Sequence, residues 1–322
     1  MDVGGTKCAV SLADETPRFL KRYELATGSY NGPDAVLEQL TRWARKLSEK
    51  ALETTGRYPL SVGISSGGPL SRESGRILSP PNLPGWDDVP IVEGFREALG
   101  IPAFLENDAN AGALAEWQFG AGRGASNVIF LTFGTGMGAG IILDGRLYRG
   151  TSDLAGEVGH IRLSEEGPVG YGKAGSFEGL CSGGGIGRQG VAAAKRLKSQ
   201  GRSCAFCSDM SRIEEISAKD VTEAANAGDP TAQAIVEDAA RYLGRGLALL
   251  ADLLNPQRII IGSVYTRNEE LFRERAMEEL KREALAGAAD VCTVLPAELR
   301  DHIGDYAALA AARYGIDESE EA

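Results

Sequence analysis

The sequence has few of the residues on which metal and redox sites depend. Its 322 residues include 2 histidines and 5 cysteines. An odd number of scattered cysteines is not a disulfide framework and fits a reducing compartment. Cys204 and Cys207 have CxxC spacing, but a zinc site would need a second pair or nearby histidines, and His160 and His302 lie far away in the sequence. We therefore disfavour a metal or redox site at this pair.

Long apolar runs and basic clusters are also missing. No apolar run reaches the roughly 18 residues that a membrane span needs, and residues 1–5 lack the apolar region of a signal peptide. The 45 acidic residues outnumber the 34 basic ones, giving a net charge of −11, which argues against nucleic acid or an anionic membrane as partner. We expect a cytoplasmic protein with two domains, each large enough to bury its own core.

What the sequence does contain is a repeated glycine turn. Residues 2–12 predict a β-hairpin with Gly4 and Gly5 at its tip, and residues 127–143 predict a second one around Gly134, Gly136 and Gly138. Glycine has no Cβ, so the backbone N–H groups of such turns can approach an anion closely. The repeat predicts two domains of related topology, each with one phosphate-binding hairpin. The first strand is short because the chain starts one residue before Asp2, so an upstream start or a truncated strand are both open.

A polar turn at residues 106–110 is the candidate catalytic segment. Residues 101–105 predict a buried strand and residues 111–119 a helix, which places Asp108 where a strand ends and a helix follows. α/β folds bind ligands at such turns. Asp108 is then a catalytic carboxylate beside amides that orient a polyol. The alternative is a helix cap supplied by Asn107 or Asp108.

The remaining segments predict scaffold elements. His160 is either a structural residue or part of a site, and the proline-rich residues 79–86 either present Asn82 and Leu83 to a ligand or form a crossover. The pattern predicts helices at 33–52, 222–254 (with a break at Asp229-Pro230), 269–286 and 305–314, and strands at 60–64, 258–261 and 291–295. It predicts a glycine-rich packed loop at 169–187, a polar connection at 195–219, and a solvated, frayed acidic tail at Asp317, Glu318, Glu320 and Glu321.

Six motifs in order resemble the ROK family (repressors, open reading frames and sugar kinases) from Asp2 to about Gly315. They are Asp-x-Gly-Gly-Thr-Lys at 2–7, Pro-Asn-Leu-x-Gly-Trp at 81–86, Glu-Asn-Asp-x-Asn at 106–110, Gly-Thr-Gly-x-Gly at 134–138, Gly-Glu-Val-Gly-His at 156–160 and Asn-Pro-x-x-Ile-Ile-Ile-Gly at 255–262. The resemblance implies an α/β, two-domain actin-like ATPase (ribonuclease H-like) fold with a central interdomain cleft. Residues 1–107 and the C-terminal helix 301–322 would form a small domain, and residues 108–300 a large one.

The resemblance also implies a site. Asp108 would accept the proton of the attacking sugar hydroxyl, in a phosphoryl transfer that needs mainly alignment and charge neutralisation. Asp2 would hold Mg²⁺ through water. The sugar would contact Gly68, Asn82, Asn107, Asp108, Glu157, His160 and Glu178. ATP would contact Gly4, Gly5, Thr6, Lys7, Gly134, Thr135, Gly136, Gly138, Gly262 and Ser263, and lobe closure would exclude water.

The sequence departs from the family at the zinc motif. Most members follow the histidine with Cys-x-Cys-Gly-x-x-Gly-Cys-x-Glu, but here Val169, Tyr171 and Ser176 stand where the cysteines belong. We expect no structural zinc, and a loop held by packing through Tyr171 and Phe177. The adenosine segment also departs, because Gly262-Ser263-Val264-Tyr265 replaces a run of glycines.

The predicted function is ATP-dependent phosphorylation of a hexose at its 6-hydroxyl, with glucose as the first candidate. N-acetylmannosamine, N-acetylglucosamine and fructose are alternative substrates within the class, and donors other than ATP stay open. A sugar-binding regulator is disfavoured because family regulators carry a helix-turn-helix domain ahead of the first hairpin. A silent sugar sensor is disfavoured by the presence of Asp2, Lys7 and Asp108. Family members are commonly homodimers or homotetramers.

Overall fold

The computed structural model describes residues 1–14 and 16–321, except the side chains of Met210 and Glu321. The chain divides into two units, each with its own apolar core. Unit 1 comprises Met1–Gly124, Arg149–Asp153 and Asp301–Ala322, and unit 2 comprises Ala125–Tyr148 and Leu154–Arg300. No helix among the described residues is long and apolar enough to cross a membrane.

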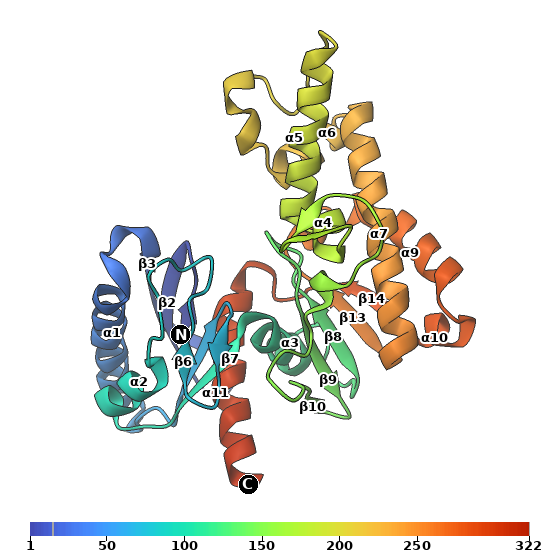
Figure 1. Ribbon diagram of the computed structural model, residues 1–322. Coiled ribbons are helices and arrows are strands. Elements are labelled where there is room, and N and C mark those ends of the chain that lie inside the picture. Colours follow the sequence, from blue (N-terminus) through green and yellow to red (C-terminus); the bar gives the residue numbers. More distant parts are fainter. Residues whose placement is uncertain (15, 322) are drawn as a thin grey trace. The chain divides into compact units, whose positions relative to one another are not determined.

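Unit 1 is built on a five-stranded sheet of order β3-β2-β1-β4-β7, whose last three strands run parallel. Its strands are β1 (Asp2–Val3), β2 (Lys7–Ala13), β3 (Phe19–Ala26), β4 (Val62–Ser66), β7 (Ala103–Asn107) and the small pair β5 (Leu70–Ser71) and β6 (Arg76–Ile77). Its helices are η1 (Thr27–Ser29), α1 (Gly32–Thr55), α2 (Ile91–Leu99), α3 (Asp108–Phe119) and α11 (Ile303–Glu321), with the 3₁₀ turn η4 (Arg300–His302) leading into α11. Helices α1 and α2 contact each other beside the sheet, and α11 packs along β4 (Figure 1).

Unit 2 repeats this topology with a sheet of order β10-β9-β8-β13-β14, again with its last three strands parallel. Its strands are β8 (Val128–Leu131), β9 (Ala139–Leu143), β10 (Arg146–Leu147), β13 (Arg258–Ile261), β14 (Thr293–Pro296) and the small hairpin β11 (Val169–Gly170) and β12 (Lys173–Ala174). Its helices are η2 (Val158–His160), α4 (Phe177–Cys181), α5 (Gly183–Ser199), η3 (Met210–Glu215), α6 (Ala218–Asn226), α7 (Pro230–Leu254), α8 (Val264–Arg267), α9 (Glu269–Glu283) and α10 (Ala286–Val291).

The matching sheets confirm the repeat predicted from the two glycine turns. In each unit an antiparallel hairpin, β1–β2 or β8–β9, adjoins a parallel strand, β4 or β13, and then a second one, β7 or β14. The break predicted at Asp229-Pro230 is also confirmed, since Pro230 begins α7 and Asp229 caps it by accepting from Ala232 N at 2.8 Å. Both hairpins therefore occupy the same position in related sheets.

Unit 1 extends beyond the boundary expected at residue 107. Helix α3 belongs to this unit because it packs on α11, where the rings of Phe119 and Tyr306 lie 5.6 Å apart. The short segment Arg149–Asp153 also belongs to unit 1, although the residues on both sides of it in the sequence belong to unit 2.

Three predictions from composition are wrong. Residues 169–187 are not an irregular loop, because they form β11, β12, α4 and the start of α5. Residues 195–219 are not a plain connection, because α5 runs to Ser199, η3 follows and α6 begins at Ala218. The acidic tail is not frayed in the described residues, because α11 continues to Glu321 and the carboxylate of Glu318 pairs with Arg149.

Candidate functional site

In unit 1 the predicted site residues gather where the parallel strands end. Strands β1, β4 and β7 lie in register, with Val3 beside Ser66 and Ser66 beside Asn107. The turns that follow these strands carry Gly4-Gly5, Gly67-Gly68 and Asn107-Asp108 respectively. Carboxyl ends of neighbouring parallel strands share one sheet edge, which is where α/β folds bind ligands.

Close approach of Asn82 and Asn107 explains two glycines of this edge. A Cβ on Gly5 would lie 2.1 Å from the Asn82 carbonyl oxygen, and one on Gly68 would lie 3.3 Å from Asn107 Nδ2. Asn82 is exposed on a turn anchored by Leu83 and Trp86, which are 1% and 2% exposed. The proline-rich segment thus places Asn82 beside the first glycine turn, whereas Leu83, which was also expected to face a ligand, is buried.

The first hairpin is fixed by Thr27, which follows β3. Thr27 N donates to the Thr6 carbonyl at 2.9 Å, and Thr27 Oγ1 donates to the Gly4 carbonyl at 2.7 Å. Lys7 Nζ lies 3.3 Å from Glu24 Oε2 on the exposed surface. The hairpin backbone is held rigidly, while the Lys7 ammonium is shared with a neighbouring carboxylate.

The turn at Asn107 forms the helix cap that was one of the two interpretations proposed from the sequence. Asn107 is the N-cap of α3, because its Oδ1 accepts from Ala109 N at 3.0 Å. Asp108 Oδ1 accepts from the same N–H at 2.8 Å, and the Asp108 side chain is exposed at the helix N-terminus. The positive end of a helix dipole favours a carboxylate at this position. The cap therefore fixes Asp108 and leaves it accessible.

Asp2 is the candidate Mg²⁺ ligand. Its carboxylate lies against Gly304 at the start of α11, where an added Cβ would stand 2.4 Å from Asp2 Oδ2. Burial raises the pKa of Asp2 above its ordinary value, and the nearby Asp305 raises it further against the opposing effect of the N-terminal ammonium. A partly buried carboxylate offers the oxygen ligands that a hard cation such as Mg²⁺ takes.

In unit 2 the second hairpin and the adenosine segment also follow adjacent parallel strands. Leu131 of β8 lies beside Ile261 of β13, so residues 132–138 and Gly262-Ser263 emerge at the same edge. Thr132 Oγ1 accepts from Gly138 N at 2.8 Å and closes the hairpin. Ser263 adopts φ 53° and ψ −113°, a conformation that favours glycine. The serine thus keeps the backbone shape expected of a glycine there.

Of the predicted sugar residues of unit 2, Glu178 packs directly on this hairpin. Glu178 Oε2 accepts from Met137 N at 3.1 Å, and a Cβ on Gly159 would lie 2.1 Å from the Met137 carbonyl oxygen. Glu157 and His160 flank that contact on the exposed ends of η2, and the rings of His160 and Tyr171 lie 6.1 Å apart. Glu178 therefore contacts the predicted phosphate hairpin, which the sequence did not suggest.

The start of α5 braces the other side of the hairpin. Gly183 N donates to the Gly134 carbonyl at 2.8 Å, Gly184 N donates to the Thr135 carbonyl at 3.1 Å, and Ser182 Oγ donates to the Thr135 carbonyl at 3.1 Å. The hairpin tip is thus held by residues of two later segments.

The three residues at the positions of the zinc cysteines differ in burial. Ser176 is fully buried and caps α4 by accepting from Gly179 N at 3.1 Å, whereas Val169 and Tyr171 are 51% and 73% exposed. Phe177 is 1% exposed and its ring covers Gly246 of α7. The prediction that Phe177 packs in this segment is confirmed, and the prediction that Tyr171 does so is wrong. All five cysteines are free thiols, and no cluster of three metal-ligating side chains occurs in the described part of the chain.

The internal repeat carries the candidate base in one unit alone. Asp108 follows β7, and the corresponding residue after β14 in unit 2 is Ala297. The two related sheets therefore differ at this position, where a carboxylate follows the last strand of the first sheet and an alanine follows the last strand of the second.

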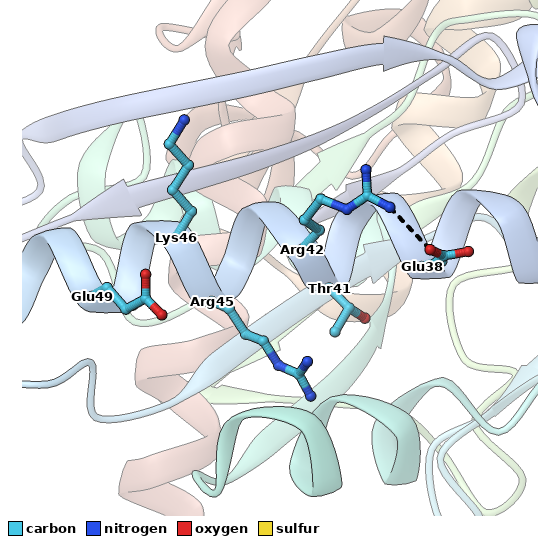
Figure 2. Close-up of a pocket in the computed structure, with 6 residues that line it drawn as sticks. All are labelled: Glu38, Thr41, Arg42, Arg45, Lys46 and Glu49. Atoms are coloured by element: carbon cyan, nitrogen blue, oxygen red, sulfur yellow. Dashed lines mark hydrogen bonds and ion pairs between the residues drawn. The ribbon is translucent and has the colours of Figure 1, made fainter.

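A hollow along α1 has no comparable chemistry. Its lining side chains are Glu38, Thr41, Arg42, Arg45, Lys46 and Glu49 (Figure 2). Arg42 pairs with Glu38 at 3.0 Å, Arg45 donates to the Ala98 carbonyl at 3.1 Å, and Lys46 lies 5.5 Å from the Tyr23 ring centroid. Each cation already has a partner within the protein.

Sequence comparison places the chain in a family. The profile of the ROK family matches residues 1–313. The chain belongs to the ROK family.

Relatives at similar identity differ in function. The glucokinase of Streptomyces coelicolor is 32% identical over 94% of this chain and 93% of its own. The N-acetylmannosamine kinase of Citrobacter koseri is 34% identical over 81% of each chain. The xylose repressor of Caldicellulosiruptor bescii is 33% identical over 76% of this chain and 61% of its own. Identity alone does not select one sugar.

Solved structures share the fold over nearly the whole chain. The ROK hexokinase of Thermus thermophilus matches with a TM-score of 0.81 at 32% identity, covering 98% of both chains. The ROK glucokinase of Streptomyces griseus, in complex with glucose and AMPPNP, matches with a TM-score of 0.74 at 32% identity, covering 97% of this chain and 98% of its own. The two-sheet α/β architecture is that of the actin-like ATPase fold of ROK kinases, and the comparisons support a sugar kinase.

Proposed function

We propose that this protein is an ATP-dependent hexose kinase that phosphorylates the 6-hydroxyl of glucose, with Asp108 as general base. The observation that carries the proposal is the Asn107-Asp108 turn at the carboxyl end of β7, beside the glycine turns after β1 and β4. The solved relative that holds glucose and an ATP analogue supports the same pair of substrates.

The chain's own residues supply three functions. Asn107, Asn82 and Glu178 provide hydrogen-bonding groups for sugar hydroxyls, with Gly68 allowing close approach. The exposed Asp108 carboxylate accepts the hydroxyl proton as the new bond to phosphorus forms. The glycine hairpins offer backbone N–H groups to phosphate oxygens.

Asp2 would hold Mg²⁺, because a carboxylate oxygen is the kind of ligand that this cation takes. When bound, the cation neutralises phosphate charge in the transfer.

The test is a coupled assay of ADP formation on a panel of glucose, fructose, N-acetylglucosamine and N-acetylmannosamine, with Asp108→Asn as the control variant. We expect turnover on glucose that is lost in the variant. Highest kcat/KM on N-acetylmannosamine would replace glucose by the sugar for which the relative from Citrobacter koseri is named. Sugar binding by calorimetry without turnover on any sugar would contradict the kinase and support a sensor.

A further inference from the structure

An arginine that none of the sequence motifs includes is bound to the first residue of the candidate catalytic turn. Arg149 Nε donates to Glu106 Oε2 at 2.9 Å, and the side chains of Arg149 and Glu106 are 11% and 5% exposed. Burial disfavours the charge of Arg149, but the carboxylates of Glu106 and Glu318 outweigh it and raise the pKa of the guanidinium. The pair is therefore a buried, charged contact.

The other oxygen of Glu106 holds the turn. Glu106 Oε1 accepts from Asn107 N at 3.0 Å and from Asn110 Nδ2 at 3.0 Å. Asn107 in turn caps α3 at Ala109 N, the same N–H that Asp108 Oδ1 contacts. One carboxylate thus joins Arg149 to the backbone of Asn107 on one side of Asp108 and to the side chain of Asn110 on the other.

Arg149 is itself held from the opposite side by α11. Its Nη1 and Nη2 donate to the two carboxylate oxygens of Glu318 at 2.7 and 3.1 Å, and its guanidinium lies 5.5 Å from the Tyr314 ring centroid. Glu318 also pairs with the more exposed Arg72 at 3.2 Å. Such a two-sided fork fixes the guanidinium plane, which a lysine could not do.

Stability alone does not account for this arrangement. A buried ion pair contributes little net stability compared with apolar side chains of the same volume, because both charges lose their hydration. The geometry instead fixes an orientation. The Arg149 guanidinium orients the carboxylate of Glu106, and that carboxylate orients the peptide N–H of Asn107. Catalytic groups need placement within about 0.5 Å, and a displacement of about 1 Å can lower the rate about 10²-fold.

We infer that Arg149 is a positioning residue for the general base, acting through Glu106 on the Asn107-Asp108 turn. The inference rests on the proposed function. It also gives a role to the segment Arg149–Asp153, which belongs to unit 1 while its sequence neighbours belong to unit 2: its first residue ties this segment to the turn that carries Asp108.

The experiment compares Arg149→Met, Arg149→Lys and the double variant Glu106→Gln/Arg149→Met with Arg72→Met, which removes the other arginine bound to Glu318. We expect Arg149→Met to lower kcat about 30- to 100-fold while the KM for ATP changes by less than about 3-fold, as for a misplaced group. Arg149→Lys recovers part of the loss, and Arg72→Met retains wild-type kcat.

The double variant separates positioning from stability. It removes both buried charges, so its melting temperature recovers toward wild type. The glutamine introduced in place of Glu106 has no fork to orient it, so kcat stays about 10-fold low or lower. Recovery of kcat together with the melting temperature, or Arg149→Met within about 3-fold of the wild-type kcat, would overturn the inference.

Hydrogen exchange of the segment 103–112 provides a readout that needs no turnover. We expect faster exchange of the Asn107 and Ala109 amides in Arg149→Met and no change in Arg72→Met. Unchanged exchange in Arg149→Met contradicts the positioning role. If the wild type turns over no sugar, the proposed function fails, and the exchange data still decide whether Arg149 orders the turn.

Discussion

The segment that replaces the family's zinc motif should depend on one aromatic ring. Phe177 is 1% exposed, its N–H donates to the Ile161 carbonyl at 2.8 Å, and its ring occupies the space over Gly246, where an added Cβ would stand 2.2 Å from Cζ. Removing a ring so enclosed leaves a cavity that the facing helix cannot fill. Phe177→Ala should therefore lower the free energy of unfolding of unit 2 by about 3–5 kcal/mol.

Urea unfolding can resolve this effect by unit. All 3 tryptophans, Trp43, Trp86 and Trp117, lie in unit 1, so tryptophan fluorescence follows that unit while far-UV circular dichroism follows both. We expect an earlier circular dichroism transition in Phe177→Ala. A chain with two cores need not unfold in one step, so both probes are needed.

Tyr171→Ala is the matched control, because Tyr171 is an aromatic residue of the same segment that is 73% exposed. It should change the stability by less than about 0.5 kcal/mol. Packing by Phe177 would be refuted if Phe177→Ala cost less than about 1 kcal/mol, or if Tyr171→Ala were equally destabilising.

Three further predictions concern the site residues. Ser263→Gly should stabilise the protein by about 1–2 kcal/mol in thermal unfolding, because it relieves a positive φ; unchanged or lower stability would contradict the strain. Asp2→Asn should raise the stability of the ligand-free protein at neutral pH while lowering kcat by roughly 10²-fold or more. The sign follows from the raised pKa of Asp2, because the folded state favours the protonated carboxyl. The stability contributed by this proton is present below the ordinary pKa of 3.8 and is lost as the pH rises through the raised pKa. The stability–pH curve of Asp2→Asn should lack this loss. Glu178→Ala should weaken binding of AMPPNP in the absence of sugar, measured by calorimetry, because it releases Met137 N in the phosphate hairpin; an unchanged Kd would show that the contact does not support the hairpin.

The sequence predicted the elements whose signals are local. Gly4-Gly5 and Gly134 to Gly138 mark hairpin tips by composition alone, and Asp229-Pro230 marks a helix start. The positions of Asn82, Asn107 and Asp108 on turns also followed from the flanking patterns.

The start of α5 was missed because three consecutive glycines disfavour a helix. Their reason lies elsewhere in the chain: a Cβ on Gly183 would stand 2.7 Å from the Gly134 carbonyl oxygen, and one on Gly184 would stand 2.5 Å from that of Thr135. Ser182 compensates by capping the helix at Gly185 N. Tertiary contact with the hairpin outweighs local propensity.

Arg149 and Glu318 could not be paired from sequence patterns. Arg149 is separated from Glu106 by 43 positions and from Glu318 by 169. An acidic C-terminal run is usually solvated, and only the packing of α11 brings Glu318 to a buried arginine. Long-range ion pairs leave no periodic signal in a single sequence.

The most direct test of the account is single-turnover and steady-state kinetics of Asp108→Asn with glucose and ATP. The substitution keeps the size of the side chain and removes the proton acceptor. We predict a kcat lower by about 10²–10⁴-fold with a glucose Kd within about 3-fold of wild type. A variant that retains more than about a tenth of the wild-type kcat would contradict Asp108 as the general base.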